Sequence, residues 1–263
     1  MGDLTGVRVI ITGATSGLGA AMADALLLAG ATVAFASRPT ARLDAGVTLR
    51  RDQGLDAVSL PMDVRDPVSV QAAAERALEG LGGIDVVVNN AGIGMGTVNP
   101  HFLEKAMPFF EVSPEGFRDV IATNLTGYFF VARAFAPLFI KQGGGRFINV
   151  TANHETMRRK GFVPYGPSRA GAEALSLIMV EDLRPYGVTV NLLLPGGATA
   201  TGIVPSEVSP QIRGGLLRPE IMGAPAVFLA SAEAHGLTGE RIVAKDFNAW
   251  LSAFRSKSAD RAP

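Results

Sequence analysis

Short apolar runs of strand length alternate along the chain with longer segments of helical periodicity. The runs are mostly apolar and do not follow a strict alternation of apolar and polar residues, which is typical of strands buried on both faces of a parallel sheet. We expect strands at residues 7–11, 32–36, 57–60, 85–88, 146–150, 188–193 and 241–243. We expect the main helices at residues 18–29, 68–79, 114–140, 167–184 and 220–230. The pattern predicts an α/β fold with one doubly wound parallel sheet of about seven strands and helices on both faces.

Composition limits the number of domains and the kinds of partner. The chain of 263 residues has no linker rich in Pro, Gly or Ser, so we expect one domain at residues 1–247 and a C-terminal tail at residues 248–263. The formal net charge is zero, which argues against a nucleic-acid partner. No apolar stretch reaches the roughly 18 residues that cross a bilayer, so no membrane partner is expected. The absence of Cys excludes disulfides and thiolate metal sites, and we expect a cytoplasmic protein without a metal site.

A glycine-rich turn stands between the first expected strand and the first expected helix. Gly13, Gly17 and Gly19 let the backbone turn tightly and approach a pyrophosphate, whose charge the N–H groups at the start of the helix would stabilise. An ordinary glycine turn is the alternative. The position between a strand and a helix at the start of the chain favours a dinucleotide site.

The end of the second expected strand bears on which dinucleotide binds. An acid at this position commonly binds the adenosine ribose, whereas a basic residue accommodates a 2′-phosphate. Here the strand ends in Ser37 and Arg38, without a carboxylate. The guanidinium of Arg38 matches phosphate, so NADP(H) is favoured over NAD(H); a solvated loop arginine is the alternative.

Further motifs follow the glycine turn in a fixed order. Asp63 follows the third expected strand, Asn89 to Gly92 follow the fourth, Asn124 lies in a helix, and Tyr165 precedes the sixth strand. Over residues 4–247 the chain resembles the short-chain dehydrogenase/reductase superfamily, whose members have a single Rossmann-type domain. The resemblance implies reversible hydride transfer between a nicotinamide and a carbonyl or alcohol substrate. The residues expected to contact the cofactor are Gly13, Thr15, Ser16, Gly17, Leu18, Gly19, Ser37, Arg38, Asp63, Val64, Asn90, Ala91, Gly92, Tyr165, Arg169, Pro195, Gly196, Thr199 and Thr201.

Tyr165 matches the general acid/base of the family. A free phenol has a pKa of about 10, so it acts near neutral pH only beside a positive charge. The residue one helical turn further on is Arg169, where the family has lysine. Arginine supplies charge and a donor to the ribose, but it stays protonated and cannot relay a proton as lysine does. In the family the mid-helix asparagine anchors a water of the relay, and Asn124 matches it.

A second departure lies thirteen residues before Tyr165, where the family has a serine that polarises the substrate and this chain has Ala152. A methyl group donates no hydrogen bond, and losing one such donor lowers a rate by about 10²- to 10³-fold. Thr151, Asn153 and His154 are the candidate replacements. Asn153 comes first because its amide donates without deprotonation, and a structural role in the loop is the alternative for all three.

Two hypotheses follow for the function. The first is an NADP(H)-dependent oxidoreductase that acts on a small-molecule carbonyl or alcohol. The second, prompted by Ala152 and Arg169, is a catalytically impaired homologue that serves as a nucleotide-binding sensor or structural protein.

Apolar residues are expected to line the substrate pocket and to form subunit contacts. The expected pocket residues are Met95, Phe102, Leu103, Met107, Phe109, Phe110, Ile203, Val204, Ile212, Leu216 and Leu217. The helices expected at residues 114–140 and 167–184 are apolar around much of their circumference, which favours a homodimer or homotetramer over a buried interior position.

Overall fold

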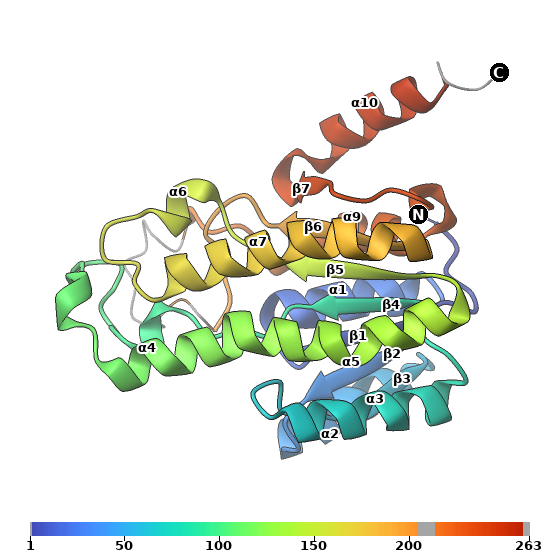
Figure 1. Ribbon diagram of the computed structural model, residues 1–263, viewed down its shortest axis with the longest axis horizontal. Coiled ribbons are helices and arrows are strands. Elements are labelled where there is room, and N and C mark those ends of the chain that lie inside the picture. Colours follow the sequence, from blue (N-terminus) through green and yellow to red (C-terminus); the bar gives the residue numbers. More distant parts are fainter. Residues whose placement is uncertain (1, 203, 205–213, 260–263) are drawn as a thin grey trace.

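The computed structural model describes residues 2–202, 204 and 214–259, and within these residues seven parallel strands form one sheet (Figure 1). The strands are β1 (Arg8–Thr12), β2 (Thr32–Ser37), β3 (Ala57–Pro61), β4 (Val86–Asn89), β5 (Gly145–Val150), β6 (Val188–Leu194) and β7 (Arg241–Val243). Their order in the sheet is β3-β2-β1-β4-β5-β6-β7. The order reverses between β1 and β4, and ligands of such sheets bind at the carboxyl ends of the strands beside that point. The predicted α/β class and strand set are therefore confirmed.

Helices cover both faces of the sheet (Figure 1). One face carries α1 (Gly17–Leu28), α2 (Ala41–Arg51) and α9 (Gly223–Ala230), and the other carries α3 (Pro67–Leu81), α5 (Gly127–Gln142) and α7 (Tyr165–Leu183). The shorter helices are α4 (Pro114–Ile121) and α6 (His154–Met157). Within the described ranges, none of the helices has both the length and the apolar character required to cross a bilayer.

Burial on both faces explains why the strands lack alternation. In β1, Val9 and Ile11 belong to the apolar cluster shared with α1 and α9, whereas Ile10 belongs to the cluster shared with α3 and α5. All three side chains are fully buried. Successive strand residues face opposite sides of a sheet, so a sheet that packs helices on both sides needs apolar residues on both faces of its strands.

The expected helix at residues 114–140 is interrupted. It starts at α4, where the Ser113 hydroxyl accepts a hydrogen bond from the Gly116 N–H at 3.1 Å. A π-helical turn then occupies Ala122–Thr126 before α5 begins. Such turns insert a residue into an α-helix and are frequent at functional sites. Asn124 lies in this turn.

Helix α2 was not predicted from the sequence. It buries only Leu43 and Val47, four residues apart, and the remainder of the helix is largely polar. A single pair of apolar residues gives too weak a periodicity to distinguish a short surface helix from a polar loop.

The segment assigned to a tail contains a further helix, α10 (Phe247–Ala259), and residues 260–263 of that tail lie outside the described residues. The ring of Trp250 stacks on that of Phe254 with centres 5.3 Å apart, and Phe228 of α9 meets both rings edge-on. These aromatic contacts attach the start of α10 to the sheet domain, and its far end projects from the body (Figure 1).

Candidate active site

A cleft of about 1120 Å³ opens beside the point where the strand order reverses. It is lined by residues that follow β1, β4, β5 and β6, and it exceeds the roughly 300–1,000 Å³ of ordinary small-molecule sites. All nineteen residues expected to contact a cofactor line this one cleft, and so does Asn153. Asn124 does not line it and lies buried behind the wall.

The glycine turn brings the start of α1 to the cleft. Gly13 and Gly17 have φ values of +69° and +56°, a conformation that glycine adopts without strain. A Cβ on Gly19 would lie 2.3 Å from the carbonyl oxygen of Gly13, so only glycine fits there. The Ser16 side chain makes no capping bond and the first turn of α1 has no acid. The helix end thus keeps its N–H donors and partial positive charge for a ligand, and the geometry fits a pyrophosphate.

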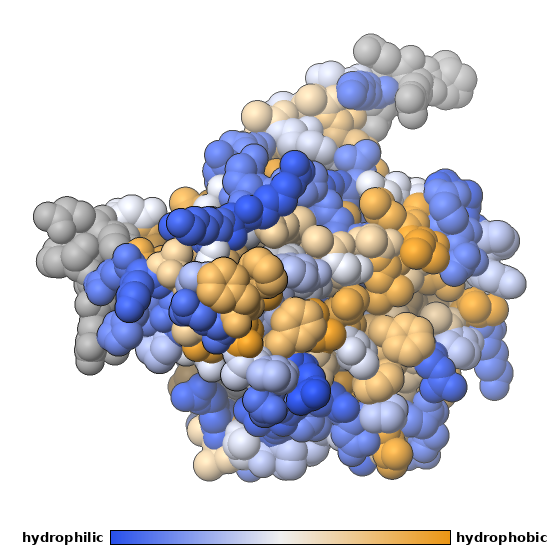
Figure 2. All heavy atoms as spheres, turned by 60° about the vertical axis from the view of Figure 1, so that its left-hand side comes forward, coloured by the Kyte–Doolittle hydropathy of each residue, from blue (hydrophilic) through white to orange (hydrophobic). Residues whose placement is uncertain are grey.

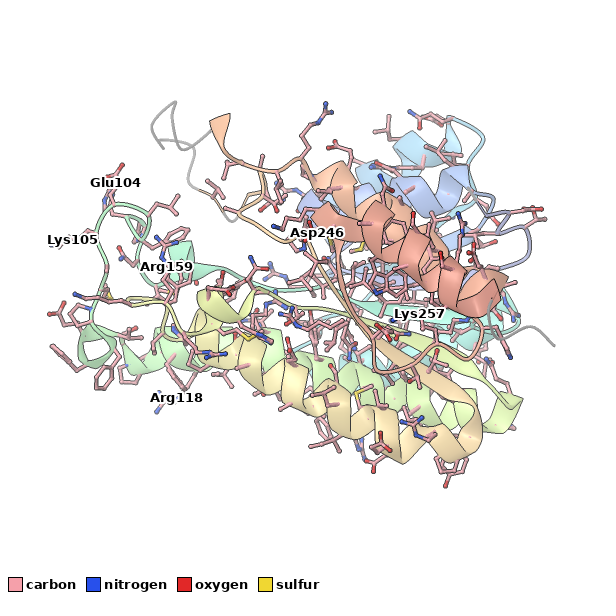
Figure 3. The ribbon with its side chains drawn as sticks, turned by 90° about the horizontal axis from the view of Figure 1, so that it is seen from above. Glu104, Lys105, Arg118, Arg159, Asp246 and Lys257 are labelled. Carbon is pink, nitrogen blue, oxygen red and sulfur yellow. The ribbon has the colours of Figure 1, made fainter. Side chains whose placement is uncertain are left out.

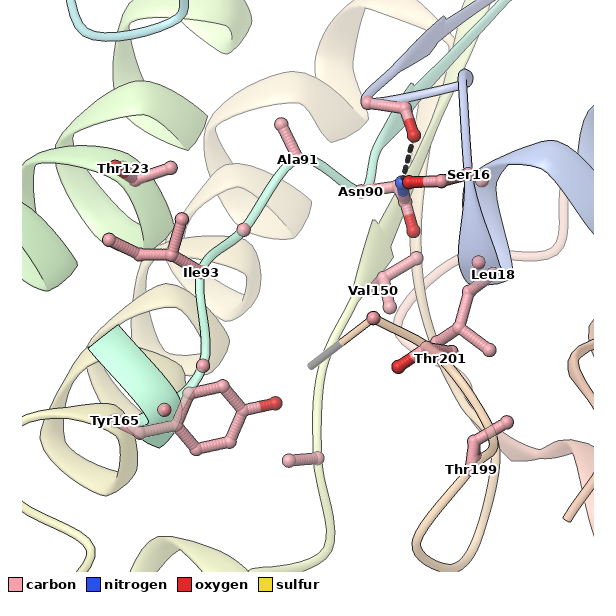
Figure 4. Close-up of a pocket in the computed structure, with 18 of the residues that line it drawn as sticks. Ser16, Leu18, Asn90, Ala91, Ile93, Thr123, Val150, Tyr165, Thr199 and Thr201 are labelled. Carbon is pink, nitrogen blue, oxygen red and sulfur yellow. Dashed lines mark hydrogen bonds between the residues drawn. The ribbon is translucent and has the colours of Figure 1, made fainter. Parts of the chain in front are cut away.

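Thr12 ties the glycine turn to the segment after β4. Its hydroxyl oxygen accepts hydrogen bonds from the backbone N–H groups of Asn90 at 2.9 Å and Ala91 at 3.0 Å, and it donates to the carbonyl of Val88 at 3.2 Å. The Asn90 side chain donates back to the carbonyls of Thr12 at 2.8 Å and Gly13 at 3.3 Å (Figure 4). Sequence reasoning did not assign a role to Thr12. A hydroxyl residue that ends a buried strand just before a glycine turn is the signal that could have indicated it.

Two unpaired cations lie at the expected adenosine end. Arg38, Arg42 and Arg65 all line the cleft there, beside Ser37 and Asp63. Arg65 lies 3.6 Å from the carboxylate of Asp63, whereas Arg38 and Arg42 form no ion pair with any residue that the structure describes. Arg42 is in α2, so the sequence prediction missed it together with that helix.

Tyr165 and Arg169 lie close together at the end of the cleft opposite the expected adenosine end. Tyr165 begins α7 and its hydroxyl points into the cleft (Figure 4). The guanidinium carbon of Arg169, one turn further on, lies 5.3 Å from the centre of the Tyr165 ring. Burial alone would lower the pKa of Arg169, but interactions with the hydroxyls of Tyr128 and Tyr165 outweigh it and hold the pKa above its ordinary value. Residue 169 is thus a permanent cation.

Asn124 connects two walls of the site from behind. Its Oδ1 accepts a hydrogen bond from the N–H of Ile93 at 2.8 Å, and its Nδ2 donates to the Ile93 carbonyl at 3.0 Å and to the Ser168 hydroxyl at 3.1 Å. These bonds fix the segment after β4 against α7. The expected role of Asn124 in holding a water stays a prediction.

The segment after β5 carries Ala152 and its neighbours. The Thr151 hydroxyl donates to Glu173 at 3.1 Å, and Nε2 of His154 lies 2.8 Å from the same carboxylate. Burial would raise the pKa of Glu173, but hydrogen bonds from His154 and Thr151 and the charge of Arg241 outweigh it, so the pKa lies below its ordinary value. Asn153 lines the cleft, and its side chain has no hydrogen bond to any described residue. Of the three candidate replacements, Asn153 alone keeps its donor for a ligand.

Apolar side chains form the wall near Tyr165. Met95, Phe102 and Leu103 line the cleft as expected, and Phe162 packs edge-on against Phe102 with ring centres 5.8 Å apart. Arg159 lies over the Phe162 ring at 4.8 Å, at the end of the molecule that carries Glu104 and Lys105 (Figure 3).

The other expected wall residues divide into three groups. Val204 lines the cleft, and Ile203 and Ile212 lie outside the described residues. The residues that do not line it are Met107, Phe109, Phe110, Leu216 and Leu217. Phe109 and Phe110 are instead largely exposed and pack edge-on against each other in a short turn of 3-10 helix.

Residues 7–211 match a family model described as short chain dehydrogenase. A gluconate 5-dehydrogenase of Gluconobacter oxydans is 30% identical over 74% of this chain and 72% of its own. A 3-oxoacyl-(acyl-carrier-protein) reductase of Vibrio cholerae is 30% identical over 91% of this chain and 96% of its own.

Solved structures agree with the fold over nearly the whole chain. A gluconate 5-dehydrogenase from Burkholderia cenocepacia, in complex with NADP and tartrate, superposes with a TM-score of 0.82 at 27% identity, covering 94% of this chain and 96% of that one. A 3-ketoacyl-(acyl-carrier-protein) reductase from Brucella melitensis, complexed with NADH, gives a TM-score of 0.80 at 28% identity, covering 91% and 97%.

The contact of Gly19 with the turn predicts a loss of stability when a methyl group is added. Gly19→Ala should lower the free energy of unfolding by about 1–3 kcal/mol, because the added Cβ would meet the backbone of Gly13 and the amide of Asn90. Gly80→Ala is the control: Gly80 lies in α3 with open space around it, and this change should raise stability by about 0.5–1 kcal/mol. Denaturant unfolding of both variants checks this, and equal stabilities would contradict it.

Proposed function

The chain belongs to the short-chain dehydrogenase family, and from this premise we propose that it is an NADP(H)-dependent oxidoreductase that interconverts a small carbonyl compound and the corresponding alcohol. One observation carries the proposal. The hydroxyl of Tyr165 points into the cleft that the glycine turn opens onto, beside the permanent cation of Arg169.

The preference for NADP(H) rests on the unpaired arginines. The two solved relatives differ in their cofactor, since one is in complex with NADP and the other with NADH. In this chain Arg38 and Arg42 line the adenosine end without an acidic partner among the described residues. Two guanidinium groups match a 2′-phosphate and leave a ribose hydroxyl without the carboxylate that NAD sites use.

Tyr165, Arg169 and Asn153 have separate roles in the proposed carbonyl reduction. When bound, the nicotinamide supplies or accepts the hydride. Tyr165 gives its hydroxyl proton to the carbonyl oxygen during reduction and takes it back during oxidation. Arg169 stabilises the negative charge left on the phenol oxygen but passes no proton, because it stays protonated. The amide of Asn153 donates to the substrate oxygen in place of the missing serine.

The walls favour a substrate with an apolar part. Met95, Phe102 and Leu103 line the cleft near Tyr165. Relatives named for gluconate and for acyl-carrier-protein substrates show that similar chains act on carbonyl compounds of different shape. The second hypothesis, a homologue without turnover, finds no support in these relatives.

We also propose a homodimer or homotetramer formed through α5 and α7. Phe129 is 45% exposed, Leu177 49% and Ile178 60%, on two helices that lie side by side on one face (Figure 1). Figure 2 shows apolar side chains gathered on this side of the molecule. Other apolar residues of the same helices, such as Phe135, are buried inside the domain. Only part of the apolar surface expected on these helices is therefore available for contact with another subunit.

Removing the Arg38 side chain should weaken the binding of NADPH much more than the binding of NADH. Arg38→Ala should raise the Kd for NADPH by about 10- to 100-fold, because a charge-assisted contact with phosphate is lost, and change the Kd for NADH by no more than about twofold. Fluorescence titration measures both values. Arg118→Ala, on the exposed surface of α4, is the control and should change neither. Equal weakening of both cofactors by Arg38→Ala would refute the assignment.

The proposed role of Asn153 as a donor in place of the serine can be tested by substitutions at positions 152 and 153. Asn153→Ala should lower kcat by about 10²-fold, and adding Ala152→Ser to that variant should recover at least about tenfold of the loss. The Kd for NADPH should stay within about twofold in both variants. Turnover is followed by NADPH absorbance with a panel of aldehydes and ketones, with Tyr165→Phe as the inactive reference. Wild-type kcat in Asn153→Ala would exclude the proposed role.

A charge on the exposed apolar face should dissociate the oligomer. Ile178→Glu should shift the sedimentation coefficient to that of the monomer, because a buried unpaired carboxylate is strongly unfavourable at an interface. Val68→Glu places the same charge at another exposed apolar position, on α3, and should leave the assembly unchanged. A wild-type chain that sediments as a monomer would rule out the proposed assembly.

A further inference from the structure

The charge of Arg169 is buried without a carboxylate partner. The residue is 3% exposed, and no acidic residue within the described ranges forms an ion pair with it. Its Nε has no hydrogen-bond partner among the residues that the structure describes. A buried cation without a counter-charge is costly, so the neutral acceptors around it decide where the guanidinium lies.

Tyr128 provides the shortest hydrogen bond to this cation. Nη1 of Arg169 donates to the Tyr128 hydroxyl at 2.7 Å and to the carbonyl of Val150 at 3.0 Å. The Tyr128 hydroxyl itself donates to that carbonyl at 3.0 Å. A phenol has one proton, so a lone pair of Tyr128 faces the guanidinium. Tyr128 is 2% exposed, and burial raises its pKa, which keeps it a neutral acceptor.

The opposite side of the guanidinium lies against Gly92. A Cβ on Gly92 would stand 2.4 Å from Nη2 of Arg169. The planar group is therefore enclosed by Tyr128 and Val150 on one side, by the Gly92 backbone on another, and by the ring of Tyr165. An arginine fork has a fixed shape that needs both this space and an acceptor placed to match it, whereas a lysine ammonium is a compact point charge on a flexible stem that can turn its donors toward other acceptors.

We propose that Tyr128 is a positioning residue whose hydroxyl holds the Arg169 guanidinium beside Tyr165, and that it is required because residue 169 is an arginine. The inference rests on the proposed function, since a fixed guanidinium serves the cofactor ribose and the Tyr165 phenol. A tyrosine that merely fills the core would be needed equally whatever cation stands at position 169.

A double-mutant cycle separates these two roles. The four chains are the wild type, Tyr128→Phe, Arg169→Lys and the double variant, and the Kd for NADPH is measured for each by fluorescence titration. We expect Tyr128→Phe to raise the Kd about tenfold beside Arg169, where a hydrogen bond to a charged group is lost, and less than about twofold beside Lys at 169. Where substrate turnover is found, kcat should follow the same pattern. Tyr186→Phe, which changes an exposed phenol in the short turn after α7, is the control and should leave the Kd for NADPH unchanged.

Thermal unfolding of the same four chains provides the control for folding. Tyr128→Phe should lower the melting temperature in both backgrounds, because both lose the bond to Val150, and should lower it further beside Arg169, which also loses its acceptor. An equal loss of NADPH affinity in both backgrounds would show that Tyr128 only fills the core and would overturn the inference while leaving the proposed function intact. A wild type that binds NADPH but turns over no carbonyl would overturn the proposed activity, and the affinity cycle would still decide the role of Tyr128. A wild type that binds no NADPH would overturn both.

Discussion

The hydroxyl of Thr12 joins the two halves of the sheet at the point where the site is built. It accepts bonds from two consecutive N–H groups after β4, while the Asn90 amide donates back across the gap to the carbonyls of Thr12 and Gly13. These bonds close the space between the glycine turn and the next loop, and Gly19 must lack a side chain for this approach. The close approach at Gly19 also leaves the N–H groups at the start of α1 facing the cleft. The packing that sets the loop geometry therefore leaves donors that fit an anion.

At the Tyr165 end of the cleft, the electrostatic environment depends on the guanidinium of Arg169. A guanidinium that stays protonated strengthens the field at Tyr165 but takes no part in proton transfer. In the proposed mechanism, the protons that reach or leave Tyr165 pass through the cleft, onto which its hydroxyl opens, and not through residue 169. Tyr128 and Gly92 make room and provide an acceptor for the larger group. The surroundings of residue 169 therefore fit a guanidinium.

The sequence predicts the parts of the molecule that depend on local pattern. Strands buried on both faces are recognisable because most of their residues are apolar, and the residues expected at the cofactor end follow strands that meet at one edge. Features that depend on contacts between distant segments were missed. Helix α2 buries too few residues to show periodicity, and Arg42 was lost with it. Tyr128 and Arg169 are 41 positions apart on different helices, and nothing in the local sequence of either indicates their bond.

The contacts of the segment after β5 bear on the proposal that Asn153 donates to the substrate oxygen. Glu173 binds Thr151 and His154, and Arg241 of β7 bonds both that carboxylate and the carbonyl of Ala152. These contacts fix the backbone on both sides of Asn153 and engage the two neighbours that could compete with it as donors. Asn153 lines the cleft beside these contacts, and its side chain has no hydrogen bond to any described residue. Because a preorganised donor is effective only when its position is fixed before the reaction, the partly buried contacts of Glu173 support the proposed role of Asn153.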